Sequence, residues 1–127
     1  MKKNNLIKIL LTIPLLLTGN NTNISAENVS YFPEEKKVQL AGDVTVQINE
    51  WEFYAQTGDF LLDEKKLYLR GSDRVNASFK NKIRLVSGSA EYIEVQLDES
   101  IVLQGSAELI SGQETIKSNK INYNFPE

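Results

Sequence analysis

The sequence predicts an all-β domain in which antiparallel strands recur as structural repeats. Apolar and polar residues alternate strictly in segments such as 44–49, which is the pattern of a strand with one buried and one exposed face. After Leu17 no segment places its apolar residues at helical spacing. An aromatic residue within a shared motif recurs from Tyr31 to Phe60, 29 residues later, and a repeat of this length is typical of stacked supersecondary units.

Residues 1–26 predict a cleavable secretory signal peptide. Lys2 and Lys3 form a positive start, an apolar stretch follows up to Leu17, and a polar segment ends at the small residue Ala26. The apolar stretch is shorter than the roughly 20 residues that a membrane-spanning helix needs. We therefore expect cleavage after Ala26 and a mature domain of residues 27–127, with retention of the segment as a membrane anchor as the alternative.

The composition excludes several classes of function. The 127 residues contain no histidine and no cysteine, which excludes Cys/His metal sites, thiol chemistry, disulfides and Ser-His-Asp triads. The net charge is -3, from 14 Lys and Arg against 17 Asp and Glu, and a domain without a basic face is a poor candidate for binding nucleic acid. We expect a domain that is no enzyme and holds neither a metal nor a cofactor.

The repeated unit consists of an aromatic strand, a charged turn and an apolar-x-Leu-x-Gly strand. Residues 26–42 align with residues 55–71, and a looser third copy spans residues 92–105. Glycine at the end of each copy predicts a sharp bend or a close approach of two backbones. These glycines are Gly42, Gly71 and Gly105.

Further strands and turns follow in order along the chain. Alternation predicts strands at residues 44–49, 75–79, 83–85 and 93–97. Turn-forming residues predict reversals at residues 33–35, 63–65, 81–82, 98–100 and 111–113. A fourth unit begins at residues 121–125.

With these features the sequence resembles the OstA/LptA family of lipopolysaccharide-transport proteins. Members carry a signal peptide and repeat a tyrosine-containing strand before a segment of the form apolar-x-Leu-x-Gly-Asn/Asp-Val. The copies most similar to this pattern are residues 31–44 and 92–107, and residues 116–123 resemble the family's Ile-x-x-x-x-Ile-x-Tyr strand. The resemblance covers essentially all of residues 27–127.

The resemblance implies an open, twisted β-jelly roll whose two sheets form a V-shaped trough. It implies that this trough shields the lipid A acyl chains of lipopolysaccharide in the periplasm and that the domain is a conduit without catalytic activity. It also implies partners, namely homologous β-jelly-roll domains of inner- and outer-membrane transport proteins. Copies would stack head to tail, and the apolar terminal strands at residues 29–32 and 121–125 offer edges for this contact.

Alternation selects the residues that would line such a trough, because acyl chains need a continuous apolar surface without buried charge. The same residues also fit the closed core of an ordinary β-sandwich, and this alternative stays open. The candidates for lipid binding are Val38, Leu40, Val44, Val46, Ile48, Phe53, Leu67, Leu69, Val75, Phe79, Ile83, Leu85, Ile93, Val95, Ile101, Leu103 and Leu109.

A basic stretch lies between residues 70 and 84 of an otherwise acidic domain. Arg70, Arg74 and Arg84 are candidates for contacts with lipid phosphates at the rim of the trough. Solubilising charge is the alternative interpretation. Trp51, at the end of a long alternating segment, would anchor the mouth of the trough or pack at a corner of a sandwich.

Two other functions remain as alternatives to a soluble carrier. One is a membrane-anchored, LptC-like partner of the same pathway, which has a similar domain behind an anchor. The other is a structural cell-surface β-repeat protein that has no lipid ligand.

Overall fold

The structure, a computed structural model, describes residues 9–12 and 22–126, and its regular elements are all β-strands. No helix that is long and apolar enough to cross a membrane occurs in this part of the chain. The strands are β1 (Ile9–Thr12), β2 (Thr22–Ala26), β3 (Asn28–Phe32), β4 (Lys37–Ile48), β5 (Trp51–Leu61), β6 (Lys66–Arg70), β7 (Ala77–Asn81), β8 (Val86–Ala90), β9 (Tyr92–Gln96), β10 (Ser100–Ser111) and β11 (Glu114–Asn124).

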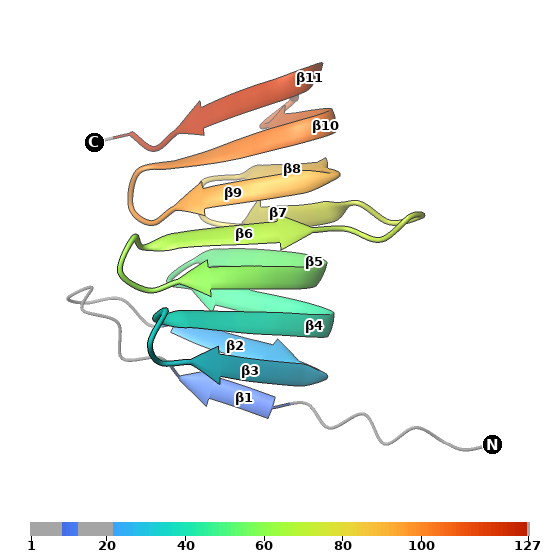
Figure 1. Cartoon of the computed structure of the whole chain (residues 1–127). Coiled ribbons are helices and arrows are strands. Elements are labelled where there is room, and N and C mark those ends of the chain that lie inside the picture. The colour runs from blue at the N-terminus through green and yellow to red at the C-terminus, as the bar shows by residue number, and fades with distance from the viewer. Residues whose placement is uncertain (1–8, 13–21, 127) are drawn as a thin grey trace.

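Two antiparallel sheets share the long strands and lie one behind the other (Figure 1). One half of β5 pairs with β6 and the other half with β7, while one half of β10 pairs with β9 and the other with β8. The front sheet comprises β3, β6 and β9 with residues 37–41, 57–61, 100–104 and 120–124 of the long strands. The back sheet comprises β1, β2, β7 and β8 with residues 44–48, 51–55, 107–111 and 114–118.

The fold prediction from the sequence is confirmed. The chain forms an all-β, antiparallel jelly roll in which strand pairs stack in a column from β3 to β11 (Figure 1). The pairings β5–β6–β9–β10–β8–β7–β5 also close six of the strands into a ring. This ring joins the two sheets along one side, which we call the crease.

Paired left-handed residues bend the long strands at the crease. Gly42 and Asp43 have φ angles of 86° and 46°, and Gly105 and Ser106 repeat this geometry at 90° and 47°. The register with the neighbouring strand shifts at both places, so that two residues oppose one, as in a β-bulge. Bulges increase twist and bend a strand, and each of these turns a long strand from one sheet into the other.

The repeated glycines allow neighbouring strands to approach closely at the crease. The N–H of Glu27 donates to the carbonyl of Gly42, and the N–H of Glu91 donates to that of Gly105, each at 2.9 Å. Gly71 starts the crossing loop 71–76, where an added Cβ would overlap the backbone of residues 75–77. The bend predicted from Leu-x-Gly is therefore observed in all three copies.

On the side opposite the crease, successive hairpins of the front sheet end in similar turns. Lys36 and Lys65 end two of these turns with φ angles of 51° and 55°. The N–H of Leu62 donates to the Lys36 carbonyl at 2.9 Å, and that of Leu97 to the Lys65 carbonyl at 3.0 Å. The sequence repeat is thus one front hairpin, and successive hairpins are tied together by their turns.

The segment 83–85 forms a turn instead of the predicted strand. The side-chain oxygen of Asn81 accepts hydrogen bonds from the N–H groups of Ile83, at 3.0 Å, and Arg84, at 2.9 Å. Leu85 then takes a left-handed φ of 58°. Hydrogen bonds from nearby backbone N–H groups to an asparagine side chain compete with strand pairing, and here they end β7.

The expected leader and the folded domain overlap in strand β2. Residues 22–25 pair with β4, and the side chains of Ile24 and Ala26 are fully buried. Cleavage after Ala26 stays a prediction, and cleavage there would remove β2 from the back sheet. Residues 1–8 and 13–21, on which most of the leader prediction falls, lie outside the described residues.

We expect Gly42→Ala to lower the free energy of unfolding by about 2–5 kcal/mol. Alanine would be strained at a positive φ, and its Cβ would lie 2.9 Å from the Cβ of Glu27. The matched control is Gly112→Ala, which has a left-handed φ of 63° but no atom within 4 Å of the added Cβ, and it should cost only about 1–2 kcal/mol. Urea denaturation of both variants measures the difference, and equal losses would contradict the packed crease.

Candidate functional site

Inward-facing side chains of the two sheets meet in one apolar interior. Strand register aligns most of these side chains in rows that cross successive strands. The front rows contain Leu40, Leu69, Ile93, Leu103 and Ile121, and Val38, Phe60, Leu67, Val95, Ile101 and Tyr123. The back rows contain Ile24, Val46, Phe53, Phe79 and Leu109, and Thr22, Ile48, Trp51, Asn81 and Val86.

The interior holds no charged side chain among the described residues. Its buried polar side chains are Thr22 and Asn81, which lie in one row near the turns of the back sheet. All the other buried residues are apolar and form a single cluster. A continuous apolar surface therefore runs through the stack between the sheets.

Most residues selected from the sequence lie in this interior. Lipid contact by them stays a prediction, since the structure shows their burial and not a ligand. The buried members of the set are Val38, Leu40, Val44, Val46, Ile48, Phe53, Leu67, Leu69, Phe79, Ile93, Val95, Ile101, Leu103 and Leu109.

The expected inward orientation is wrong for three residues. Val75, Ile83 and Leu85 are 67%, 76% and 69% exposed. Val75 lies in the crossing loop 71–76, where its carbonyl accepts a hydrogen bond from the N–H of Ser72 at 2.8 Å. Ile83 and Leu85 belong to the Asn81 turn described above. Alternation over so few residues does not distinguish a strand from a turn.

One aromatic residue of the interior, Phe60, was not selected by alternation. Phe60 is fully buried, together with Phe53 and Phe79, whose rings lie 6.1 Å apart. The only sequence signal for Phe60 is its place in the aromatic repeat. The side chains of the two sheets pack directly against one another, as in the core of a β-sandwich.

An aromatic cluster spans the open side of the V, which we call the mouth. Trp51 begins β5 at a turn of the back sheet, whereas Tyr123 lies in the front part of β11. The Trp51 ring stacks on Phe125 at 4.7 Å with an interplanar angle of 9°, and it meets Tyr123 edge-on at 6.0 Å. This packing fits both of the roles predicted for Trp51, an anchor at the mouth and a packed residue at a corner of a sandwich.

Polar groups line the rim beside this cluster. The Arg84 Nε lies 3.8 Å from a carboxylate oxygen of Glu50, so that two back-sheet turns are joined by an ion pair. A hollow of about 190 Å³ lies between these turns and the front turn at Leu97. Within the described residues no group of three or more acidic side chains is placed to hold a metal ion.

The three candidate arginines do not share a site. Only Arg84 lies at the mouth. Arg70 ends β6 at the crease, where its guanidinium carbon lies 5.0 Å from the centre of the Tyr92 ring, and Arg74 lies in the crossing loop. Arg70 and Arg74 are separated from Arg84 because β7 carries the chain from the crease to the mouth between residues 77 and 81. Contact of any of the three arginines with lipid phosphates stays a prediction.

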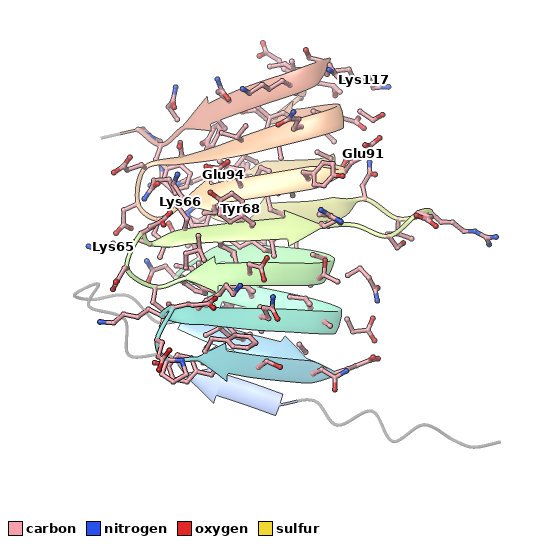
Figure 2. The ribbon with its side chains drawn as sticks, viewed as in Figure 1. Lys65, Lys66, Tyr68, Glu91, Glu94 and Lys117 are labelled. Carbon is pink, nitrogen blue, oxygen red and sulfur yellow. The ribbon has the colours of Figure 1, made fainter. Side chains whose placement is uncertain are left out.

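The outer faces of both sheets are polar. Figure 2 shows Lys66, Tyr68 and Glu94 together on the front sheet, where Lys66 Nζ lies 3.6 Å from Glu94 Oε2. The charges of Tyr68 and Glu94 raise the pKa of Lys66. On the back sheet the Tyr54 hydroxyl donates to Glu52 at 2.5 Å, and this hydrogen bond lowers the pKa of Glu52 and raises that of Tyr54.

A wider hollow of about 730 Å³ lies on the outer face of the front sheet. It is bordered by polar side chains such as Gln39, Asp59 and Glu94, with Tyr68 and Tyr92. These residues point away from the apolar interior. The hollow is therefore separate from the interior between the sheets.

The bent, two-sheet jelly roll around an apolar interior is the fold of the LptA-like class of periplasmic transport proteins. A solved structure with this fold is LptH from Pseudomonas aeruginosa, described as the LptA homologous periplasmic component of the conserved lipopolysaccharide transport device. The TM-score is 0.74 at 17% sequence identity, over 81% of this chain and 75% of LptH. No family model matches the sequence, and no curated protein matches it.

We expect Ile93→Ala to lower the free energy of unfolding by about 2–5 kcal/mol, because it leaves a cavity in the interior. Ile83→Ala, which removes the same atoms from an exposed turn, should change it by less than about 0.5 kcal/mol. Urea denaturation measures both variants. Similar losses in the two would show that residue 83 is buried after all.

Proposed function

We propose that the protein is a periplasmic carrier of lipopolysaccharide and that the acyl chains of lipid A bind between its two sheets. The observation that carries the proposal is the continuous interior, whose buried side chains are apolar except for Thr22 and Asn81 among the described residues. The shared fold with LptH, a component of a lipopolysaccharide transport device, supports it. Nothing in the proposal requires catalysis or a cofactor.

Acyl chains can replace the contacts that apolar side chains of one sheet make with those of the other. The strand ladders run along the stack, within each sheet and through the crease, whereas apolar side chains meet across the interior. Separation of the sheets at the mouth would break dispersion contacts and leave the ladders intact. Burial of each methylene group of a lipid contributes about 0.8 kcal/mol, so a chain of ordinary length offsets the loss of several side-chain contacts.

Export and processing form part of the proposal. We assign the protein to the periplasm, directed there by a signal peptide within residues 1–26. A retained leader would instead make it an LptC-like, membrane-anchored partner of the same pathway. The buried position of β2 favours a mature protein that keeps residues 22–26.

Site-specific photocrosslinking tests lipid binding directly. A benzoyl-phenylalanine introduced at Val46, Leu69 or Leu103 should crosslink to lipopolysaccharide in cells, because all three side chains point into the interior. Crosslinked lipid is detected as a shifted band with an antibody against lipopolysaccharide.

The neighbouring outward positions provide matched controls on the same strands. Probes at Thr45, Tyr68 and Val102 should give no lipid adduct, since strand alternation directs them away from the interior. Adducts absent from every inward position would overturn the carrier proposal in favour of a structural β-repeat protein. Equal adducts at both sets would place the lipid outside the trough.

The two ends of the stack suit head-to-tail association. Strands β3 and β11 lie at opposite ends (Figure 1), and among the described residues each pairs on one side only. Tyr31 and Ile116, which continue the inward rows at these ends, are 58% and 48% exposed. Pairing of β3 with the front part of β11 of a second copy would cover Tyr31 and extend the front wall of the apolar interior.

Engineered cysteines test this stacking, since the natural chain contains none. A protein with Ser30→Cys in β3 and Asn122→Cys in β11 should give a ladder of disulfide-linked oligomers under mild oxidation. The control pair Gln39→Cys and Val102→Cys, on interior strands of the same sheet, should stay monomeric. A monomer at high micromolar concentration, without a ladder, would contradict the stacking.

A further inference from the structure

The aromatic cluster at the mouth joins the two sheets on the side opposite the crease. We call Trp51, Tyr123 and Phe125 the latch. Trp51 belongs to the back sheet, and Tyr123 to the front sheet. Phe125 follows the last residue of β11 and continues its inward alternation from Ile121 through Tyr123. The stack of Trp51 on Phe125 therefore bridges the rims of the trough.

The latch lies between the interior and the rim. Besides its contacts with Tyr123 and Phe125, the Trp51 ring lies 6.5 Å from Phe53 and 5.8 Å from Phe79, which are both buried in the interior. Trp51 itself is only 6% exposed. An apolar chain that enters from the mouth at this point would have to pass these rings.

The part of the latch that follows β11 is held by few interactions. The N–H of Phe125 donates to the carbonyl of Glu99 at 2.9 Å, and its ring packs on Trp51 and Tyr123. Residues 125 and 126 lie outside every strand. Phe125 can therefore leave the mouth without the loss of any strand pairing.

Space for an apolar group already exists beside the latch. The lining of the 190 Å³ hollow at the mouth includes Phe53, Val95, Phe125 and Pro126. Withdrawal of Phe125 would join this hollow to the position that its ring now fills. That position is flanked by aromatic rings and suits a linear hydrocarbon chain.

We propose that the latch gates the trough, with Phe125 occupying the mouth in the unloaded protein and withdrawing when an apolar chain enters. The inference rests on the proposed carrier function for the identity of the natural ligand. The gate itself is a property of Trp51, Tyr123 and Phe125 and can be measured with a simple apolar probe.

Trp51 is the single tryptophan of the chain and reports directly on the gate. In Phe125→Ala, the Trp51 emission should shift to longer wavelength, and its quenching by acrylamide should increase. Binding of the apolar dye N-phenyl-1-naphthylamine should strengthen by about threefold to tenfold, as expected when one or two aromatic contacts no longer oppose entry. The test uses the purified protein in its exported form.

The matched control is Phe32→Ala, which removes the same ring from an exposed position at the far end of the front sheet. It should leave Trp51 emission, quenching and dye binding unchanged. Circular dichroism and thermal unfolding show whether both variants keep the fold. If Phe125→Ala is poorly folded, Phe125→Leu, which removes the ring with less loss of volume, provides the same readouts.

The outcomes separate the gate from the carrier function. Exposure of Trp51 and stronger dye binding in the Phe125 variants support the gate, even if no crosslink to lipopolysaccharide forms from Leu103. Unchanged Trp51 emission and dye binding in folded variants overturn the gate, even if that crosslink does form. Equal effects of Phe32→Ala and Phe125→Ala would also overturn it.

Discussion

Two kinds of interaction hold the structure together, and they act in different directions. Backbone hydrogen bonds run along the stack and hold each strand to the next, while apolar side chains hold the two sheets together across the interior. With no cysteine available for a disulfide, burial and backbone pairing must supply the stability of the domain. The interior is for this reason both the core of the unloaded protein and the surface that we propose for lipid. Under this proposal, the sandwich and trough interpretations of the alternating residues describe two states of one arrangement.

The crease shows how a short sequence motif sets the shape of the molecule. A flat strand would leave the inward faces of its two halves in one plane, whereas the bulges at Gly42–Asp43 and Gly105–Ser106 turn the halves toward each other. Because the bulges recur at equivalent places in the repeat, the bends lie above one another along the stack. In each Leu-x-Gly motif the leucine side chain points into the interior, and at the glycine the chain leaves the front sheet.

Sequence reasoning succeeds where a single periodicity decides the structure and fails where contacts distant in the chain decide it. Strict alternation was sufficient to place residues such as Val46, Leu69 and Leu103 in the interior. It failed at Ile83, because the side chain of Asn81 redirects the backbone. Proximity in sequence also grouped the arginines of residues 70–84, although a strand that crosses from crease to mouth separates them. The stacking of Trp51 on Phe125 joins residues more than seventy positions apart, and no local pattern predicts such a contact.

The two sides of the V differ in what would have to break for the sheets to separate. At the crease, strands β5 and β10 continue from one sheet into the other, and the closed ring of pairings ties their neighbours to them. At the mouth, aromatic rings and the backbone hydrogen bond of Phe125 hold the rims around the latch. Covalent continuity and strand ladders resist opening far more strongly than a few ring contacts. Any opening that admits an apolar chain must therefore begin at the mouth and pivot about the crease, which places the latch residues at the point where the unloaded and loaded states first diverge.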